Sequence, residues 1–180
     1  MRRPKKEIKE MDIIVGLLKT CQVGRLGTMG ADGYPMIKPL NFVYDRNAIY
    51  FHSALEGEKM EDIRRDGRVC FEIDLPLAYA KSAEGPCLTD YLYRSVIIRG
   101  RASPVETAVE KIGVLKMLMM KYEPPSTVGE FPENKVAVTG VVRIDIETMT
   151  GKEDLGSGKV RDAVLKALEE GSSLPIVVQK

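Results

Sequence analysis

The sequence contains no tryptophan, a single histidine and only three cysteines among its 180 residues. One histidine leaves too few imidazoles for a typical zinc site, and Cys21, Cys70 and Cys87 include no C-x-x-C pair. A transition-metal centre and dithiol chemistry are therefore not expected, and the cysteines are interpreted as reduced structural thiols. A nucleophilic triad is not expected either, because the sequence has no G-x-S-x-G motif whose serine His52 could activate.

An excess of charge is also missing, since 27 basic and 26 acidic residues give a formal net charge of +1. The protein as a whole has no electrostatic reason to bind nucleic acid or a membrane surface, so neither partner is expected. The basic segment Met1–Lys6 is followed by further charged residues instead of an apolar stretch, which indicates neither a signal peptide nor a membrane span. A cytoplasmic location is the resulting expectation.

The chain is long enough for one globular domain with a buried core, and 44% of its residues are hydrophobic. Segments with the two-residue period of strands alternate with fewer segments of helical period. Strands are predicted over Val23–Met29, Pro35–Tyr44, Ala48–Ser53, Val69–Ile73, Tyr91–Ala102 and Val136–Glu147. Helices are predicted over Glu7–Thr20, Lys59–Asp66, Val105–Lys121 and Lys159–Glu170, and loops over Leu75–Thr89 and Glu123–Glu133. The core stripe predicted for the third helix consists of Val109, Ile112, Leu115 and Met119.

The stretch Gly33–Asp74 carries the most informative chemical signal and includes the lone histidine. Its loop Ala54–Lys59 follows a strand and precedes a helix, so backbone N–H groups, the helix dipole and Lys59 converge where an anion is favoured. Earlier in the stretch, Pro39 cannot donate a hydrogen bond to a neighbouring strand. We therefore expect a bulge or an unpaired edge at Pro39, with backbone free to face a ligand.

Two glycine-rich segments resemble phosphate-binding loops but lack the required residues. Gly24–Gly30 does not have the G-x-G-x-x-G spacing and precedes a hairpin instead of a helix. Gly156–Lys159 resembles the end of a P-loop, but Glu153 replaces its first glycine and Val160 replaces the hydroxyl residue that contacts magnesium. The remaining interpretation is binding of an anion and a ring in the Gly33–Asp74 stretch.

Several longer motifs in this chain resemble those of a known family. In order, they are GRLGT, DGYP, PLNFVYD, IYFHSA followed by GEKMEDI, YRSVIIRGRA, and VVRIDIETMTGK. Together they are similar to the nitroimidazole-resistance branch of the pyridoxamine 5′-phosphate oxidase-like, FMN-binding split barrels. The resemblance implies a mainly β fold with flanking helices, a six-stranded antiparallel split β-barrel. It also implies a homodimer with FMN at the subunit interface. The FMN-binding split-barrel domain would comprise residues 1–152, and residues 153–180 would be a C-terminal extension with a short helix.

The resemblance also implies roles for individual residues. Lys38, Pro39, Leu40 and Asn41 would run along the flavin with backbone groups, in agreement with the expectation for Pro39. Phe51, His52 and Ser53 would lie beside the ring and the ribityl chain. Lys59 would hold the phosphate, and Tyr93, Arg94 and Ser95 would close the site. His52 is the candidate catalytic residue, and no metal ligand is implied.

One position departs from the wider superfamily, in which an arginine often precedes the phosphate-binding lysine. Here that position is Glu58. A carboxylate next to a phosphate is repulsive unless it points to solvent. We therefore expect compensation by Arg25 or Arg94, or a lowered affinity for FMN.

The function implied by the resemblance is an FMN-dependent oxidoreductase. It would pass electrons from a reduced nicotinamide or another donor to a small aromatic or nitro-substituted acceptor, with His52 orienting or protonating the acceptor. Two alternatives stay open. The chain could be a non-catalytic flavin- or haem-binding module, with His52 as the only available imidazole ligand, or a deazaflavin-dependent reductase.

Overall fold

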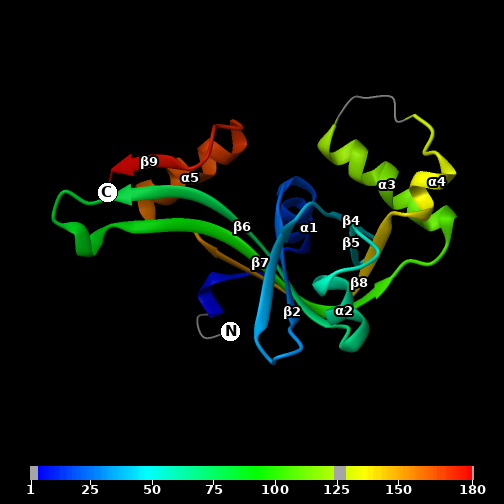
Figure 1. The fold of residues 1–180 in the computed structure, drawn as a ribbon. Coiled ribbons are helices and arrows are strands. Elements are labelled where there is room, and N and C mark those ends of the chain that lie inside the picture. The colour runs from blue at the N-terminus through cyan, green and yellow to red at the C-terminus, as the bar shows by residue number, and fades with distance from the viewer. Residues whose placement is uncertain (1–3, 124–128, 180) are drawn as a thin grey trace. The chain divides into compact units, whose positions relative to one another are not determined.

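A computed structural model of the protein describes residues 4–123 and 129–179. The chain divides into two compact units. Unit 1 comprises Met1–Ile14, Asp74–Val96 and Thr150–Lys180, and unit 2 comprises Val15–Ile73 and Ile97–Met149. Three long strands, β6 (Arg68–Lys81), β7 (Asp90–Pro104) and β8 (Gly140–Asp154), contribute residues to both units (Figure 1).

The dominant element is an antiparallel sheet with the strand order β3-β2-β6-β7-β8-β5-β4. Besides the three long strands, it contains β2 (Gly24–Met29), β3 (Pro35–Leu40), β4 (Val43–Asp45) and β5 (Ala48–Ser53). Two short strands lie off this path: β1 (Glu7–Ile8) pairs with β8, and β9 (Ile176–Gln179) pairs in parallel with β6. Within the described residues the order ends at β3 and β4 without closing. The predicted fold class is therefore confirmed, and the six strands of six or more residues are those of the predicted split barrel.

Unit 2 is filled by the inward side chains of these strands. Leu26 of β2, Phe51 of β5 and Phe71 of β6 are fully buried. Phe42, just after β3, packs edge-to-face on Phe71 with ring centroids 4.9 Å apart. The Phe71 ring covers Gly24, where an added Cβ would lie 2.1 Å from a ring carbon. A glycine is therefore required at the start of β2.

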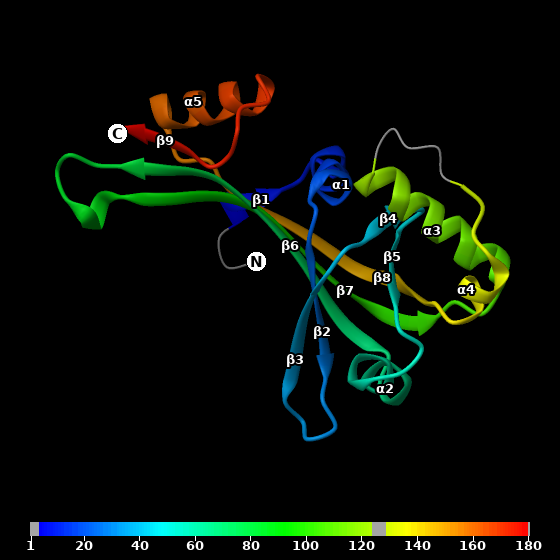
Figure 2. The ribbon, with the colours of Figure 1, turned by 45° about the horizontal axis from the view of Figure 1, so that its top comes forward.

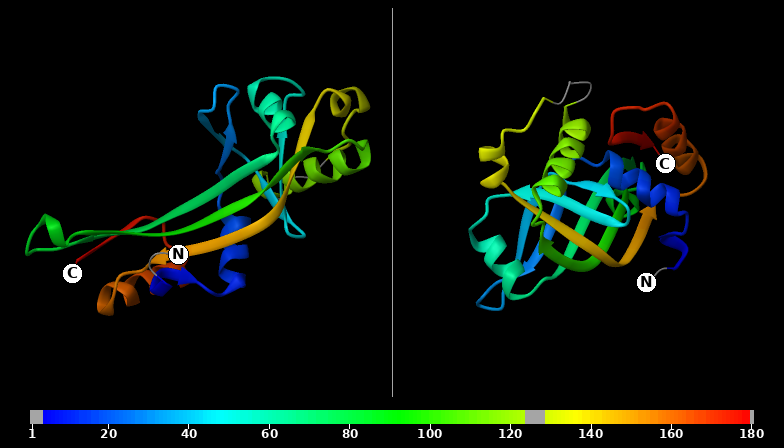
Figure 3. Two further views of the ribbon diagram at one scale, coloured as in Figure 1. Left: turned by 90° about the horizontal axis from the view of Figure 1, so that it is seen from below. Right: turned by 90° about the vertical axis from the view of Figure 1, so that its right-hand side faces the viewer.

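Five helices accompany the strands in the described residues. They are α1 (Met11–Thr20), α2 (Glu58–Arg65), α3 (Ala108–Tyr122), α4 (Glu133–Ala137) and α5 (Gly158–Glu169), with short 3₁₀ turns at Pro4–Lys6 and Pro86–Leu88. Helix α3 packs on β4 and β5 (Figures 2 and 3). Its buried residues, Val114 and Leu118, join Val43 and Tyr50 in one hydrophobic cluster.

In unit 1, α5 and β9 cover the far part of β6, as Figure 1 shows. Leu77 and Ala80 of β6, Leu92 of β7, and Val160 and Val164 of α5 form a hydrophobic cluster there. The helix predicted over Lys159–Glu170 is confirmed as α5. Gly171 follows it with a φ of 65°, the conformation expected just after a helix end.

Besides shifted ends, such as that of β8 at Asp154 instead of Glu147, four assignments differ from the structure. The first helix begins at Met11, because Glu7 and Ile8 pair with Lys152 and Gly151 of β8. The strand predicted over Pro35–Tyr44 is interrupted at residues 41 and 42 and forms β3 and β4. Pro39 pairs in register with Arg25, so it causes no bulge, but β3 is an edge strand, as proposed.

The other two differences concern loops. The predicted loop Leu75–Thr89 is wrong for its first seven residues, because β6 continues to Lys81; residues 82–89, with a short 3₁₀ turn, connect β6 to β7, which begins at Asp90. The contacts with α5 and β9 stabilise that extension. The loop predicted over 123–133 lies partly outside the described residues. Residues 133–137 form α4, so the last strand begins at Gly140 instead of Val136.

Candidate functional site

Two lysines of unit 2, Lys38 on β3 and Lys59 on α2, lie close enough for the charge of Lys38 to affect Lys59. Lys38 is one of the inward-facing residues of β3, and its Nζ atom is buried. This Nζ lies 2.7 Å from Oε2 of Glu58, yet it makes no hydrogen bond of acceptable geometry within the described residues. The distance shows an ion pair, but the ammonium group still has N–H donors without an acceptor. A buried donor in that state is unfavourable unless a ligand satisfies it.

Lys59, in the first turn of α2, increases the positive charge at this place. Its Nζ lies 5.1 Å from the centroid of the buried Phe51 ring. Burial lowers the pKa of Lys59, and the charge of Lys38 lowers it further. Two ammonium groups that disfavour each other's charge would both be stabilised by an anion between them.

The backbone around Lys59 is suited to the same anion. Helix α2 begins after Gly57, which has a φ of 106° and provides no side-chain cap. The first N–H groups of a helix have no intrahelical acceptor and carry the positive end of its dipole. Arg64 donates to the carbonyl of Leu55 at 2.7 Å and so holds the preceding loop against the helix. Met60 and Glu61 already donate to the Gly57 carbonyl, so the donors that this end of α2 presents are the N–H groups of Glu58 and Lys59.

Helix α2 is anchored by Asp62, which is 2% exposed. Thr28 of β2 donates to Oδ2 of Asp62 at 2.8 Å, and Arg65 donates to Oδ1 at 2.7 Å. Burial alone would raise the pKa of Asp62, but these hydrogen bonds outweigh it, so the pKa lies below its usual value. Asp62 therefore stays ionised and fixes the helix that carries Lys59.

Glu58 is compensated by neither of the two arginines considered from the sequence. Arg25 is paired with Glu72 at 3.1 Å in unit 2, and Arg94 is paired with Glu153 at 2.9 Å in unit 1. The cation that Glu58 contacts is Lys38, and the Glu58 side chain is 59% exposed. Its carboxylate can turn to solvent when another anion approaches Lys38. Sequence reasoning considered only the backbone of Lys38, because the pairing of residues 38 and 58 depends on the tertiary fold.

A cavity of about 320 Å³ lies elsewhere in unit 2. Asn41 and His52 line it together with side chains from α3 and with Phe131. The His52 side chain makes no hydrogen bond to the described residues, so its imidazole is available to a ligand.

The two neighbouring residues Phe51 and His52 lie on opposite faces of β5. Phe51 is fully buried and faces Lys59, whereas His52 is exposed and lines the cavity. Successive side chains of a strand alternate in this way. The structure therefore brings Phe51 together with Lys59, and His52 together with Asn41. Ser53 is half-buried and pairs with Gly140 of β8.

The remaining predicted residues are placed as follows. On β3, Pro39 is exposed and Leu40 is half-buried. Tyr93, Arg94 and Ser95 belong to β7 in unit 1 and are half-buried, with Lys152 Nζ 5.3 Å from the centroid of the Tyr93 ring. Their part in a common site with the residues of unit 2 stays a prediction.

Neither a membrane-spanning helix nor a metal site occurs in the described residues. None of the helices there combines the length and the apolar composition that a membrane crossing requires. No group of three or more histidine, cysteine, aspartate or glutamate side chains is arranged there to hold a metal ion.

Known proteins similar to this chain share its fold. A proposed 5-nitroimidazole antibiotic resistance protein from Bacteroides thetaiotaomicron VPI-5482 is 24% identical, with a TM-score of 0.73 over 82% of this chain and 86% of its own. The flavocytochrome Anf3 from Azotobacter vinelandii and the FAD and haem binding protein from Mycobacterium smegmatis are each 17% identical with a TM-score of 0.76. They cover 91% and 90% of this chain, and 77% and 80% of their own chains, respectively.

No curated protein matches the chain. The sequence profile of the pyridoxamine 5′-phosphate oxidase family, however, matches residues 10–153. This match includes the lysine pair, the cavity and all of unit 2. The family indicated by the sequence motifs is thereby confirmed: the chain belongs to the pyridoxamine 5′-phosphate oxidase family.

Proposed function

We propose that the protein is an FMN-binding oxidoreductase that passes electrons from a reduced nicotinamide or another donor to a small aromatic or nitro-substituted acceptor. The observation that carries this proposal is the pair of cations Lys38 and Lys59 at the start of α2, where the only carboxylate on the buried Lys38 ammonium group within the described residues is that of the exposed Glu58. A phosphate group would supply hydrogen-bond acceptors and the negative charge that one exposed carboxylate does not provide for two ammonium groups. The family match and the flavins named for two of the similar structures support a flavin phosphate in particular.

The residues around the start of α2 fit such a cofactor. Lys38 and Lys59 would hold the phosphate with the first N–H groups of α2, while Glu58 turns to solvent. The backbone of residues 38–40, on edge strand β3, and of Asn41, just after it, would contact the flavin, because an edge strand has one side without a partner strand. When bound, the flavin supplies the electron transfer.

His52 would have the catalytic role in this proposal. Its imidazole is exposed, lines the cavity and is free of hydrogen bonds to the described residues. It could therefore orient an acceptor or donate a proton to it. We further propose a homodimer with the cofactor at the interface, in which Tyr93, Arg94 and Ser95 of one subunit close a site.

The test is the absorbance spectrum of the purified protein, before and after incubation with FMN and desalting. A bound-flavin spectrum is expected, with Lys59→Met losing FMN affinity and Lys116→Met serving as control, because Lys116 is an exposed lysine on α3. Absence of flavin absorbance after loading would refute the proposal. Titration with FMN, FAD and a deazaflavin in parallel would identify the preferred cofactor.

Haem binding is a second candidate, favoured by the position of His52 in a largely apolar cavity. Two of the similar structures also have haem in their names, as a flavocytochrome and as a FAD and haem binding protein. An imidazole in an apolar pocket is a common axial arrangement for haem iron. A Soret band that disappears in His52→Ala would support this candidate, and no band after incubation with haem would reject it.

A further inference from the structure

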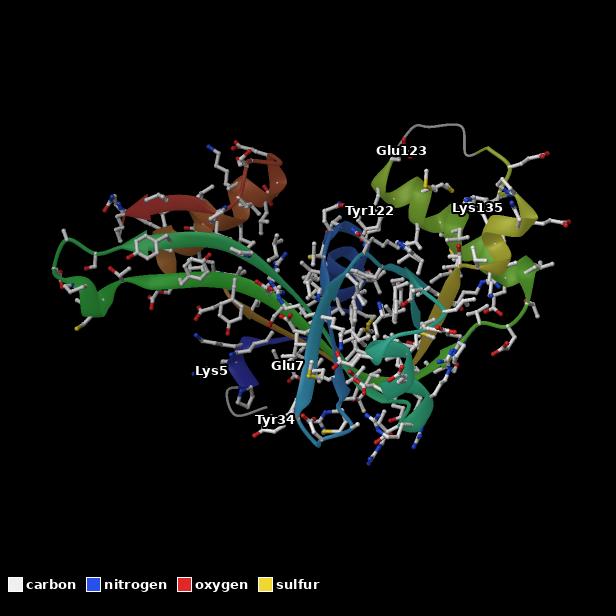
Figure 4. The ribbon with its side chains drawn as sticks, in the orientation of Figure 1. Lys5, Glu7, Tyr34, Tyr122, Glu123 and Lys135 are labelled. Carbon is white, nitrogen blue, oxygen red and sulfur yellow. The ribbon has the colours of Figure 1, made fainter. Side chains whose placement is uncertain are left out.

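A second cavity of unit 2 lies beside α3 and has charged side chains in its lining. Its volume of about 410 Å³ is that of a small-molecule site. It is lined by residues 110–117 of α3, by the hairpin of β4 and β5, and by Arg143 of β8. The His52 cavity lies towards the C-terminal end of α3, which Tyr122 marks in Figure 4, and the two cavities share no lining residue. We call the second one the Tyr50 cavity.

The hydroxyl group of Tyr50 is a buried donor in the wall of this cavity. Tyr50 is 6% exposed, and its hydroxyl oxygen accepts a hydrogen bond from Nη1 of Arg143 at 2.8 Å. The hydroxyl hydrogen has no acceptor among the described residues. Burial raises the pKa of Tyr50, the charge of Arg143 opposes this shift, and nearby carboxylates add to it. The hydroxyl group is therefore protonated at neutral pH, and a ligand would supply the acceptor that it lacks.

Arg143 is fixed in position beside this hydroxyl group and has further donors for the same acceptor. Its Nε donates to Oδ1 of Asp145 at 2.7 Å, and its guanidinium carbon lies 5.6 Å from the centroid of the Tyr50 ring. The Nη2 group makes no hydrogen bond to the described residues. A carboxylate in the cavity would accept from the tyrosine hydroxyl and pair with the guanidinium.

Two acidic side chains in the same lining suit a group of the opposite charge. The carboxylate of Glu110 has no ion pair or hydrogen bond within the described residues. Asp45 is paired only with Arg46 there, at 3.8 Å, and the Arg46 side chain is 92% exposed. Both carboxylates lie close enough to Tyr50 to raise its pKa. An ammonium group in the cavity would gain two carboxylate partners.

From this arrangement we infer that the Tyr50 cavity binds a small zwitterion of the aliphatic α-amino-acid class, whose carboxylate lies against Tyr50 and Arg143. Its ammonium group lies against Glu110 and Asp45. Side chains of both charges line the cavity, so a ligand with a single charge would leave part of the lining unmatched. This binding goes beyond the proposed function and does not depend on a flavin.

L-leucine and two single-charge analogues test the inference, because Val114 and Met117 give the cavity apolar surface for an aliphatic side chain. 3-Methylbutylamine lacks the carboxylate of leucine, and 4-methylpentanoate lacks its ammonium group. Calorimetric titration of the full-length protein should show saturable binding of leucine. Each analogue should bind about 10-fold more weakly or worse, since it loses charge-assisted hydrogen bonds. No binding of leucine, or equal binding of either analogue, would overturn the inference.

Gly113 permits a variant that fills the cavity without crowding the fold. It lies in the cavity wall, inside α3, and a Cβ added there would meet no atom within 4 Å. Gly16, inside α1, has the same free space but lies outside the cavity. Methionine also has a higher helix propensity than glycine. Gly113→Met should weaken leucine binding about 10-fold or more, and Gly16→Met should leave it within about two-fold. Unchanged binding in Gly113→Met would contradict the inference.

Glu110→Gln tests the orientation of the ligand. It removes negative charge from the ammonium side alone, so leucine should bind about 10-fold more weakly. Binding of 4-methylpentanoate should not weaken, because the lost charge repels a carboxylate. Glu106→Gln, at an exposed glutamate outside the cavity, is the matched control and should leave both affinities unchanged. Equal losses for leucine and 4-methylpentanoate in Glu110→Gln would overturn the assignment of the two ends.

Discussion

The two faces of strand β5 differ in the kind of ligand that they suit. On the face of Phe51, two lysines come together, and the buried ammonium of Lys38 has unsatisfied donors. On the face of His52, a cavity is lined by neutral side chains, and the nearby Lys121 is satisfied by backbone carbonyls. Two ammonium groups beside one exposed carboxylate favour a further anion, whereas an apolar lining with few polar groups favours an uncharged ring. Strand β5 thus lies between a region suited to a phosphate group, on the Phe51 face, and a region suited to an aromatic ring, on the His52 face.

The largest effect should come from removing the charge on the Phe51 face. In Lys59→Met, FMN affinity should fall about 10- to 100-fold, since a charge-assisted hydrogen bond contributes about 1.5–3 kcal/mol. Lys38→Met should act in the same direction, whereas Lys116→Met, at an exposed lysine of α3, should leave FMN affinity unchanged. Fluorescence titration measures the FMN affinity of each variant. An unchanged affinity in both Lys38→Met and Lys59→Met would show that the phosphate does not bind on the Phe51 face.

Replacement of Asp62, the buried carboxylate that anchors α2, should lower the stability of the protein. Asp62→Ala leaves the buried Thr28 hydroxyl without its acceptor, so the free energy of unfolding should fall by about 1–3 kcal/mol. Glu61→Ala, an exposed neighbour on the same helix, should change it by less than about 0.5 kcal/mol. Chemical denaturation provides the values. A stability loss of the same size in both variants would reject Asp62 as the anchor of α2.

Parts of this comparison could be predicted from the sequence and parts could not. Strand β5 is predicted at its observed ends and α2 within one residue, because period, turn residues and loop signals are local. The length of β6 could not be predicted, because the contacts that stabilise it beyond Pro76 come from α5 and β9, at the distant end of the chain. The Lys38–Glu58 ion pair could not be predicted either, because its two residues are far apart in the sequence and are brought together only by the fold.

Helix α3 shows the same limit at the level of single side chains. The predicted stripe includes Val109, which is 84% exposed, whereas Val114 and Leu118 are the buried residues. Leu115 and Met119, predicted as core, line the cavity instead. Hydrophobic period identifies the helix, but it cannot distinguish a side chain that packs on the sheet from one that faces a cavity, because both are apolar.

The pH dependence of stability tests the burial of Lys121, the neighbour of the cavity-lining Tyr122. Burial lowers its pKa to about 8, from 10.5. Between these values the unfolded chain binds more protons than the folded one, so this lysine makes stability rise with pH from about 8 to 10.5. Relative to Lys121→Met, the wild type should gain on the order of 1–2 kcal/mol in that range, after a discount for solvent screening. Denaturation across pH 6–10.5 checks this gain. A difference that does not vary with pH would contradict the burial of this charge.

The smallest effect is expected at Glu58, whose carboxylate would compete with the FMN phosphate for Lys38. Glu58 contacts Lys38 at 2.7 Å while remaining 59% exposed, so its ion pair is worth no more than about 1 kcal/mol. Glu58→Gln should therefore raise FMN affinity by about two- to five-fold, and the gain should shrink at high salt because the competition is electrostatic. Glu61→Gln provides a control on the same helix. A lower affinity in Glu58→Gln would show instead that Glu58 holds Lys38 in place for the phosphate, and Glu58 would then be a positioning residue.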